Sequence, residues 1–212
     1  MQKTKIQKTK TQKTKTQKPK AAKPNSQKQK TIQPKIQKPN IPTKAECDEM
    51  MKRWGMSENI LRHSLQVNKV SMFLAKKLKN TGLKIKLQLV DKGSLLHDLD
   101  KIRTLKTDQH GIVADEFLTK QGFPEVGKIA RWHRFTFIKD STLPWEAKIV
   151  NYADKRVKHD KIVTLQDRFT DLLLRYDVKT PDHDAIQRFF QLEKEIFTRI
   201  KLNPEKLESY LK

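Results

Sequence analysis

The sequence predicts an all-α protein, a bundle of about eight helices that follows a basic N-terminal tail. Three observations lead to this prediction. Beyond residue 44 apolar residues recur at helical spacing, helix start and stop signals fall at the ends of these segments, and no segment shows the alternation typical of strands. The 168 residues that follow the tail (45–212) suit one globular domain with a substantial core.

The tail, residues 1–44, repeats a Gln-Lys-Thr-Lys unit and then becomes rich in proline. It contains 14 lysines and no arginine, acid, aromatic residue or glycine, in a chain whose formal net charge is +22. Because it lacks apolar side chains that could offset the entropy of ordering, we expect it to be disordered. Such a polycation would contact nucleic acid without sequence preference. A solubilising leader without a partner explains the composition equally well.

The first helices of the domain are predicted from capping signals. Thr43 and Glu46 form a capping box that opens a helix, and Gly55 ends it. Ser57 can cap the second helix, and a third is expected over about residues 85–97.

The later helices are predicted from acids, prolines and polar caps at the starts of apolar segments. A fourth helix is expected to begin at Asp108 and to end before Gly122. Prolines suit the first position of the next two helices, and three polar residues can cap the remaining ones: Pro124 and Pro144, then Thr164, Thr180 and Asn203.

Several classes of protein are excluded by composition. The single cysteine, Cys47, rules out a disulfide framework and a cysteine-rich zinc module, and it suits a reducing compartment. No apolar run approaches the roughly 18 residues of a membrane span, and the N-terminus resembles no targeting signal. We therefore expect a cytoplasmic protein with no membrane partner, whose metal sites would use histidine and carboxylate.

Three His-Asp dipeptides occur, although the abundance of the two residues predicts fewer than one. His183-Asp184 falls in the first turn of a helix, where acids complement the macrodipole. His159-Asp160 lies among lysines at a polar helix end, where a solvated face is the better explanation. His97-Asp98 ends an apolar helix, so both side chains should emerge at the edge of the core. A carboxylate there is costly unless it is paired or bound to a metal.

Four further polar residues lie on apolar faces or at helix edges: His63, His110, His133 and Asp154. Asp154 is the most informative, because only Lys155 and Lys158 are nearby charge partners in the sequence. A cation inside the domain would explain this acid.

Together these residues make six nitrogen and oxygen ligands, which suit two octahedral first-row ions better than one tetrahedral zinc. Asp98 is the natural bridge. One ion would be bound by His63, His97 and Asp154 and the other by His110 and His133. We expect Fe, Mn, Co or Ni rather than Zn or Mg. Two such ions would generate a bridging hydroxide and stabilise charge on a phosphoryl oxygen. If His110 and His133 lay apart from Asp98, a single structural metal would be the alternative.

These motifs resemble the HD-domain metal-dependent phosphohydrolases over about residues 57–170. The resemblance lies in His63, then Leu95-Leu96-His97-Asp98-Leu99-Asp100-Lys101, then Tyr152-Ala153-Asp154-Lys155. His110-Gly111 and Arg131-Trp132-His133 resemble the two-metal subset, which includes bacterial hydrolases of dinucleoside tetraphosphates and cyclic-dinucleotide phosphodiesterases. The resemblance implies a helical bundle with the metals at its centre.

The chain departs from related patterns at three points. The HDIG form has glycine where this chain has Asp100, so the backbone and the charge of the site could differ there. The glycine-tyrosine-proline signature of cyclic-di-GMP phosphodiesterases is missing. So is the glutamate that soon follows His-Asp in deoxynucleotide monophosphatases.

Substrate contacts are predicted from cations beside the ligands. Asp98 and Lys101 are the predicted catalytic residues. Lys101 lies one helical turn beyond Asp98, so its ammonium could reach a substrate phosphate. A solvated lysine is an equal alternative. Arg134 and Arg156 are the other substrate-binding candidates. Arg168 is expected to pair with a surface acid instead.

The leading hypothesis is therefore a hydrolase of a phosphoester or phosphoanhydride, with a nucleotide as the expected small-molecule substrate. The alternative is a non-catalytic RNA- or ribosome-binding module that acts through the lysine-rich tail.

Overall fold

The computed structural model describes residues 41–175 and 179–212. The predicted disordered tail therefore lies almost wholly outside the described residues. None of the helices described is long and apolar enough to cross a membrane.

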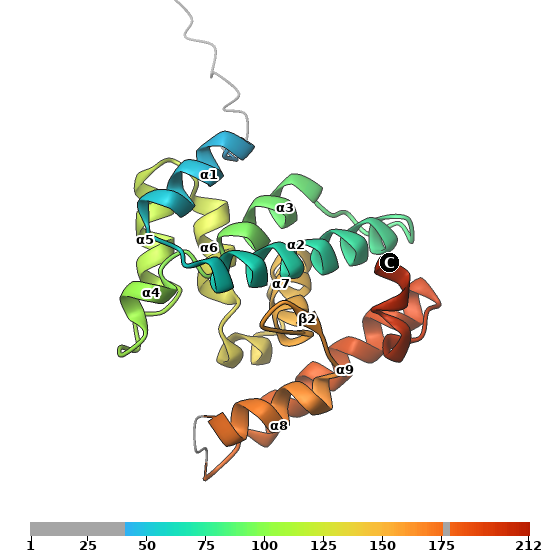
Figure 1. Ribbon diagram of the computed structural model, residues 1–212. Coiled ribbons are helices and arrows are strands. Elements are labelled where there is room, and N and C mark those ends of the chain that lie inside the picture. Colours follow the sequence, from blue (N-terminus) through green and yellow to red (C-terminus); the bar gives the residue numbers. More distant parts are fainter. Residues whose placement is uncertain (1–40, 176–178) are drawn as a thin grey trace, which may run out of the picture. The chain divides into compact units, whose positions relative to one another are not determined.

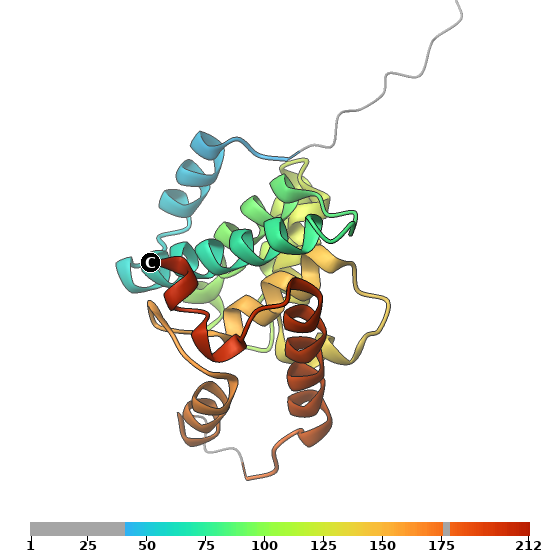
Figure 2. The same cartoon turned by 90° about the vertical axis from the view of Figure 1, so that its right-hand side faces the viewer.

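The all-α prediction is confirmed for the described residues (Figures 1 and 2). Eight helices exceed two turns, and a single helical turn, three 3₁₀ turns and one small hairpin join them. In chain order the elements are α1 (Lys44–Arg53), α2 (Glu58–Lys79), α3 (Leu87–Leu96), α4 (Lys101–Thr104), α5 (Ile112–Lys120), α6 (Pro124–Trp132), η1 (Phe135–Lys139), α7 (Trp145–Lys155), β1 (Val157–Lys158), β2 (Lys161–Ile162), α8 (Leu165–Arg175), α9 (His183–Ile200), η2 (Pro204–Lys206) and η3 (Ser209–Leu211).

The long helix α2 packs against α3 and α7, while α3 also packs on α6 and α6 on α5. Val67, Val70 and Leu74, on the inward face of α2, are fully buried. Figure 1 shows α2 running across the domain with α3, α6 and α7 gathered beside it. The helices α2, α3, α6 and α7 therefore pack around one region of the core.

Most of the predicted helix starts are confirmed. Thr43 and Glu46 form the capping box of α1, and Pro124 is the first residue of α6. Thr164 Oγ1 accepts the backbone N–H of Asp167 at 3.1 Å, and Asn203 caps a 3₁₀ turn.

Three predicted starts are displaced. The helix expected from Asp108 begins at Ile112, because Gly111 interrupts the backbone with a φ of +76°. Pro144 precedes α7 instead of opening it, and Asp182 caps α9 in place of Thr180.

A hairpin replaces the helix end that the sequence predicted around His159-Asp160. Strand β1 pairs antiparallel with β2, with Val157 opposite Ile162. His159 turns the chain with a φ of +55°. The helix α7 ends at Lys155, so this His-Asp pair lies in a tight turn.

Candidate metal centre

All six predicted ligands converge where the helices meet. His63 comes from α2, His97 and Asp98 from the end of α3, and Asp154 from α7. The other two are His110, in the turn before α5, and His133, which caps the C-terminus of α6. Their ligand atoms form two compact groups, His63 with His97 and Asp154, and Asp98 with His110 and His133.

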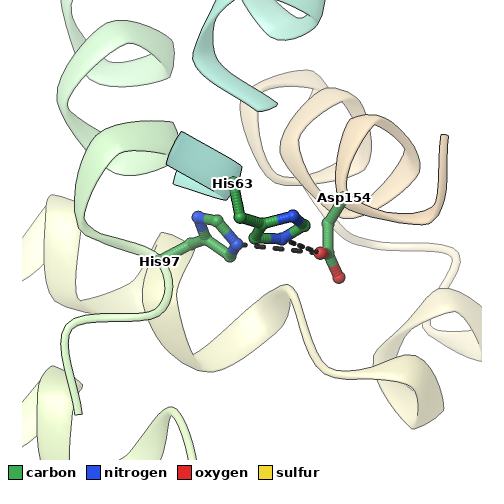
Figure 3. A group of neighbouring side chains, drawn as sticks. All are labelled: His63, His97 and Asp154. Carbon is green, nitrogen blue, oxygen red and sulfur yellow. Dashed lines mark hydrogen bonds and ion pairs between the residues drawn. The ribbon is translucent and has the colours of Figure 1, made fainter. Parts of the chain in front are cut away.

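The first group surrounds one carboxylate oxygen of Asp154 (Figure 3). The Nε2 atom of His63 lies 3.0 Å from Asp154 Oδ1, and His97 Nε2 lies 3.7 Å from the same oxygen. His97 is fully buried, and its Nε2 has no hydrogen-bond partner among the described residues. A buried nitrogen without a partner is costly in a folded protein unless something else satisfies it.

The second group surrounds Oδ1 of Asp98. His110 Nε2 lies 3.0 Å and His133 Nε2 3.5 Å from this oxygen. The two Nε2 atoms are themselves 3.0 Å apart. Two unprotonated ring nitrogens at this distance would repel each other unless a proton or a cation lay between them.

Asp98 lies between the groups and presents one oxygen to each. Its Oδ1 faces the second group, whereas Oδ2 lies 3.9 Å from His63 Nε2 and 3.7 Å from His97 Nε2. A carboxylate in this position could bridge two cations, as the sequence predicted. The alternative of a single metal required His110 and His133 to lie apart from Asp98, and they do not.

The histidine rings are held by hydrogen bonds on their outer sides. Three of them place Nδ1 close to a backbone carbonyl: His63 at 2.7 Å from His159, His97 at 2.7 Å from Ser94, and His133 at 2.5 Å from Ala130. When Nδ1–H donates to a carbonyl, the neutral ring leaves a lone pair on Nε2. The rings therefore direct that lone pair to the centre, as metal-binding histidines do.

Asp100 holds the fourth ring. Its Oδ1 lies 2.9 Å from His110 Nδ1, and its Oδ2 accepts the backbone N–H groups of Gly111 and Ala114 at 2.8 and 2.9 Å. This carboxylate is fully buried. The sequence marks Asp100 only as a departure from glycine and gives no sign that it positions His110.

Both acids of the centre favour the ionised form. Burial alone would raise the pKa of Asp98, but the Lys101 ammonium, His97 and hydrogen bonds from the second group hold it well below its usual range. Burial opposes ionisation of Asp154 too, and the charge of Lys155 with hydrogen bonds from His63 lowers its pKa well below normal. Carboxylates that stay charged in a buried site are suited to bind cations.

The histidines differ in protonation. Burial lowers the pKa of His133 to about 4 despite its hydrogen bond to Asp98. For His63 and His110 burial also acts to lower the pKa, but hydrogen bonds to Asp154 and to Asp100 and Asp98 outweigh it and raise the pKa above the usual 6.5. His133 is therefore a neutral ligand at pH 7, whereas the other two compete for protons.

These donors fit divalent cations. They combine imidazole nitrogen and carboxylate oxygen with no thiolate, a set that suits Mn, Fe, Co, Ni or Zn. Such ions would satisfy His97 Nε2, which lacks a hydrogen-bond partner among the described residues, and the close pair of Nε2 atoms in the second group.

Comparison with known proteins agrees with the resemblance to the HD-domain family that the sequence motifs show. The family model described as "HD domain" matches residues 60–170, more than half of the chain. The chain belongs to the HD domain family. The chain is 31% identical over 160 residues to an uncharacterized protein of Methanocaldococcus jannaschii, a match that covers 68% of this chain and 92% of that protein. No solved structure matches.

A pocket of about 470 Å³ adjoins the candidate metal centre of this HD domain. His110, His133 and Asp154 reach it from the centre. Two predicted substrate contacts also line it, Lys101 and Arg134. The Lys101 ammonium lies 3.2 Å from Asp98 Oδ1.

Arg156, the third predicted contact, is not brought to the HD domain's pocket. It is buried, and its guanidinium donates to Val163 O at 2.7 Å, Tyr152 Oη at 2.6 Å, Glu193 Oε2 at 2.7 Å and Pro204 O at 3.0 Å. Arg156 caps the C-terminus of α7, and two residues correspond to about 200° of helical rotation, so its side chain leaves on the side opposite Asp154.

Two cations near the centre were missed as site residues. Lys155 is buried, with its ammonium on Asp154 Oδ2 and 3.2 Å from the carbonyl of His133. Arg168 pairs with an acid as expected, its Nη1 donating to Asp171 Oδ2 at 3.4 Å, but it also lines the pocket. A sequence signal existed, because Arg168 falls on the apolar stripe of Leu165, Phe169 and Leu172.

Proposed function

We propose that this HD domain is a metal-dependent hydrolase of phosphoester or phosphoanhydride bonds. The observation that carries the proposal is the position of Asp98, which offers one oxygen to each of two histidine-containing groups. The family typically acts on phosphate compounds, and a nucleotide is the first substrate class to test.

In this proposal His63, His97 and Asp154 hold one divalent ion, and His110 and His133 hold the other, with Asp98 shared. Bound ions of this kind lower the pKa of water and offset charge that develops on a phosphoryl oxygen. Fe, Mn, Co or Ni suits the donors better than Mg, which prefers oxygen ligands and water.

The chain's own residues orient the ligands and the substrate. Lys155 occupies Asp154 Oδ2, which leaves Oδ1 directed at the two histidines. Lys101 and Arg134 line the pocket beside the second group, and we assign to both a hydrogen bond to a substrate phosphate oxygen. We assign no such contact to Arg156.

The test is hydrolysis by purified protein that has been stripped with a chelator and then supplied separately with Mn²⁺, Fe²⁺, Co²⁺, Ni²⁺, Zn²⁺ or Mg²⁺. The substrates are nucleoside mono-, di- and triphosphates, dinucleoside polyphosphates and an aryl phosphate. We expect turnover with at least one of the first four ions and its loss on chelation. Absence of turnover with every ion and substrate would contradict the proposal.

A matched pair of variants controls for general effects. Asp98→Asn should lower kcat/KM by more than about 100-fold. Loss of a residue that only hydrogen-bonds to a metal ligand already lowers metal affinity or activity by about 10–100-fold. Asp184→Asn changes the exposed acid of another His-Asp pair, at the start of α9, and should leave kcat/KM unchanged. Equal kcat/KM in the two variants, with helicity retained in both, would contradict the assignment of Asp98.

A further inference from the structure

The pocket beside the candidate metal centre has an apolar wall formed by residues that are not ligands. Phe135 from η1, Phe169 with Leu172 and Leu173 from α8, and Ile186 from α9 form it. Two of these rings are fixed by packing. The ring centroids of Phe135 and Phe169 lie 5.9 Å apart, and they lie 5.4 and 5.5 Å, respectively, from the ring centroid of the buried Phe189. The wall is therefore preformed.

Arginine side chains complement this wall. Arg168 is buried, yet its Nε has no hydrogen-bond partner among the described residues. Arg134 makes no ion pair with any residue in the described part of the chain, although it lines the same pocket. A guanidinium presents a planar set of donors that matches phosphate oxygens. A phosphate in the pocket would satisfy the orphaned Arg168 donor.

Beyond the ligands and the cations, polar side chains are few in the pocket. Among the described lining residues they come from Thr180 and Asp182, and Asp182 already accepts Ala185 N–H at 3.1 Å and pairs with Lys139 at 2.8 Å. A polyhydroxylated leaving group would give up hydrogen bonds to water there without replacing them. A flat apolar ring would lose nothing comparable.

We propose that the pocket selects phosphate compounds whose leaving group carries an aromatic ring system, with Arg168 and Arg134 on the phosphate and the ring against Phe135, Phe169 and Leu173. This inference rests on the proposed function, because it takes the phosphate to lie at the metal centre. The volume of about 470 Å³ is within the range of small-molecule sites and accommodates one such ligand.

Binding of two phosphonates that cannot be hydrolysed tests the ring. Benzylphosphonate and methylphosphonate share the anionic group and differ only in the aromatic ring. Calorimetry on the Mn²⁺-loaded full chain should show benzylphosphonate binding at least about tenfold more tightly, as burial of a ring requires. Equal affinities would overturn the inference.

Leu173→Gln against Leu174→Gln isolates the wall. The two residues are neighbours on α8, but Leu173 lines the pocket whereas Leu174 is 78% exposed and does not. Leu173→Gln should reduce the preference for benzylphosphonate at least threefold, and Leu174→Gln should leave it unchanged. The same preference in both variants would count against the wall.

Arg168→Gln isolates the phosphate contact. It should weaken both phosphonates about equally, by tenfold or more, and Arg168→Lys should restore part of the loss. If Arg168→Gln fails to fold, the half-buried Arg134→Gln provides the same comparison. Unchanged affinity for both probes in a folded variant would overturn the assignment.

The two proposals fail in different ways. Ring preference in a protein without turnover for any ion would leave the ligand class standing and remove the hydrolase. Turnover with no ring preference would do the reverse.

Discussion

The two groups of ligands differ in how the protein positions them. The first takes His63, His97 and Asp154 from α2, the end of α3 and α7, and both of its rings are anchored to backbone carbonyls. The second includes His110, which lies in a turn and depends on the Asp100 carboxylate. Asp98 joins the two groups.

This difference separates two ways of fixing a metal ligand. Helix packing and backbone carbonyls place the first group, so few single side-chain changes can release it. One carboxylate holds both a ring and the two N–H groups of the turn in the second group. We therefore expect the second group to be easier to disrupt.

The largest effect should come from removing one histidine from each group. If the ions act as a unit, His97→Asn and His133→Asn should each lower kcat/KM by more than about 100-fold, and the double variant should cost little more, because residues that act together are not additive. Kinetics and metal analysis of the three proteins measure this. Additive losses would indicate that the groups work independently.

Asp100→Asn should affect the second group alone. Replacing the carboxylate by an amide removes one acceptor, so affinity for one of two ions should fall about 10–100-fold while the other stays bound. Calorimetric titration with Mn²⁺ distinguishes the two sites. The control is Asp108→Asn, an exposed acid in the same turn. Equal weakening of both sites would contradict the division between the groups.

Gly111→Ala should destabilise the turn that carries His110. Gly111 has a φ of +76°, and an added Cβ would lie 2.7 Å from the carbonyl oxygen of Ala130. Gly82 has a φ of +93° but open space around it, so Gly82→Ala reports the backbone cost alone. We expect a loss of about 1–2 kcal/mol in unfolding free energy for Gly82→Ala and roughly 2–4 kcal/mol for Gly111→Ala, measured by denaturant titration.

A smaller effect is expected from pH, and here the groups should behave alike. Each contains one histidine with a raised pKa, His63 or His110, and the protonated form dominates below that pKa. Metal must displace this proton, so apparent affinity should fall between pH 8 and pH 6, by at most about 100-fold for one proton at each site. His133, with a pKa of about 4, stays neutral throughout and contributes nothing. Affinity independent of pH would contradict this account.

The sequence predicted the fold class and the six converging residues well. His97-Asp98 at the end of an apolar helix and Asp154 on an apolar face are local signals, because a buried polar group must be satisfied. The order of these residues also carried the resemblance to the HD family. The capping box at Thr43 is equally local.

What the sequence did not predict depends on long-range placement. The role of Asp100 requires a turn ten residues later to fold back onto it. Arg156 was chosen for its nearness to Asp154 in sequence, although helical rotation directs it away, whereas Arg168 reaches the pocket from a different helix. The RNA-binding alternative depends on the tail and stays a prediction, since residues 1–40 lie outside the described part of the chain.

The hairpin after α7 has a consequence for tracing distant relatives. The His63 ring is anchored by the main-chain oxygen of His159 and not by the His159 imidazole, so the anchor does not depend on which side chain residue 159 carries. Any amino acid that tolerates the left-handed backbone, such as asparagine or glycine, could occupy this corner. Distant members of the HD domain family could therefore retain this hydrogen bond although the residue type at the position of His159 differs.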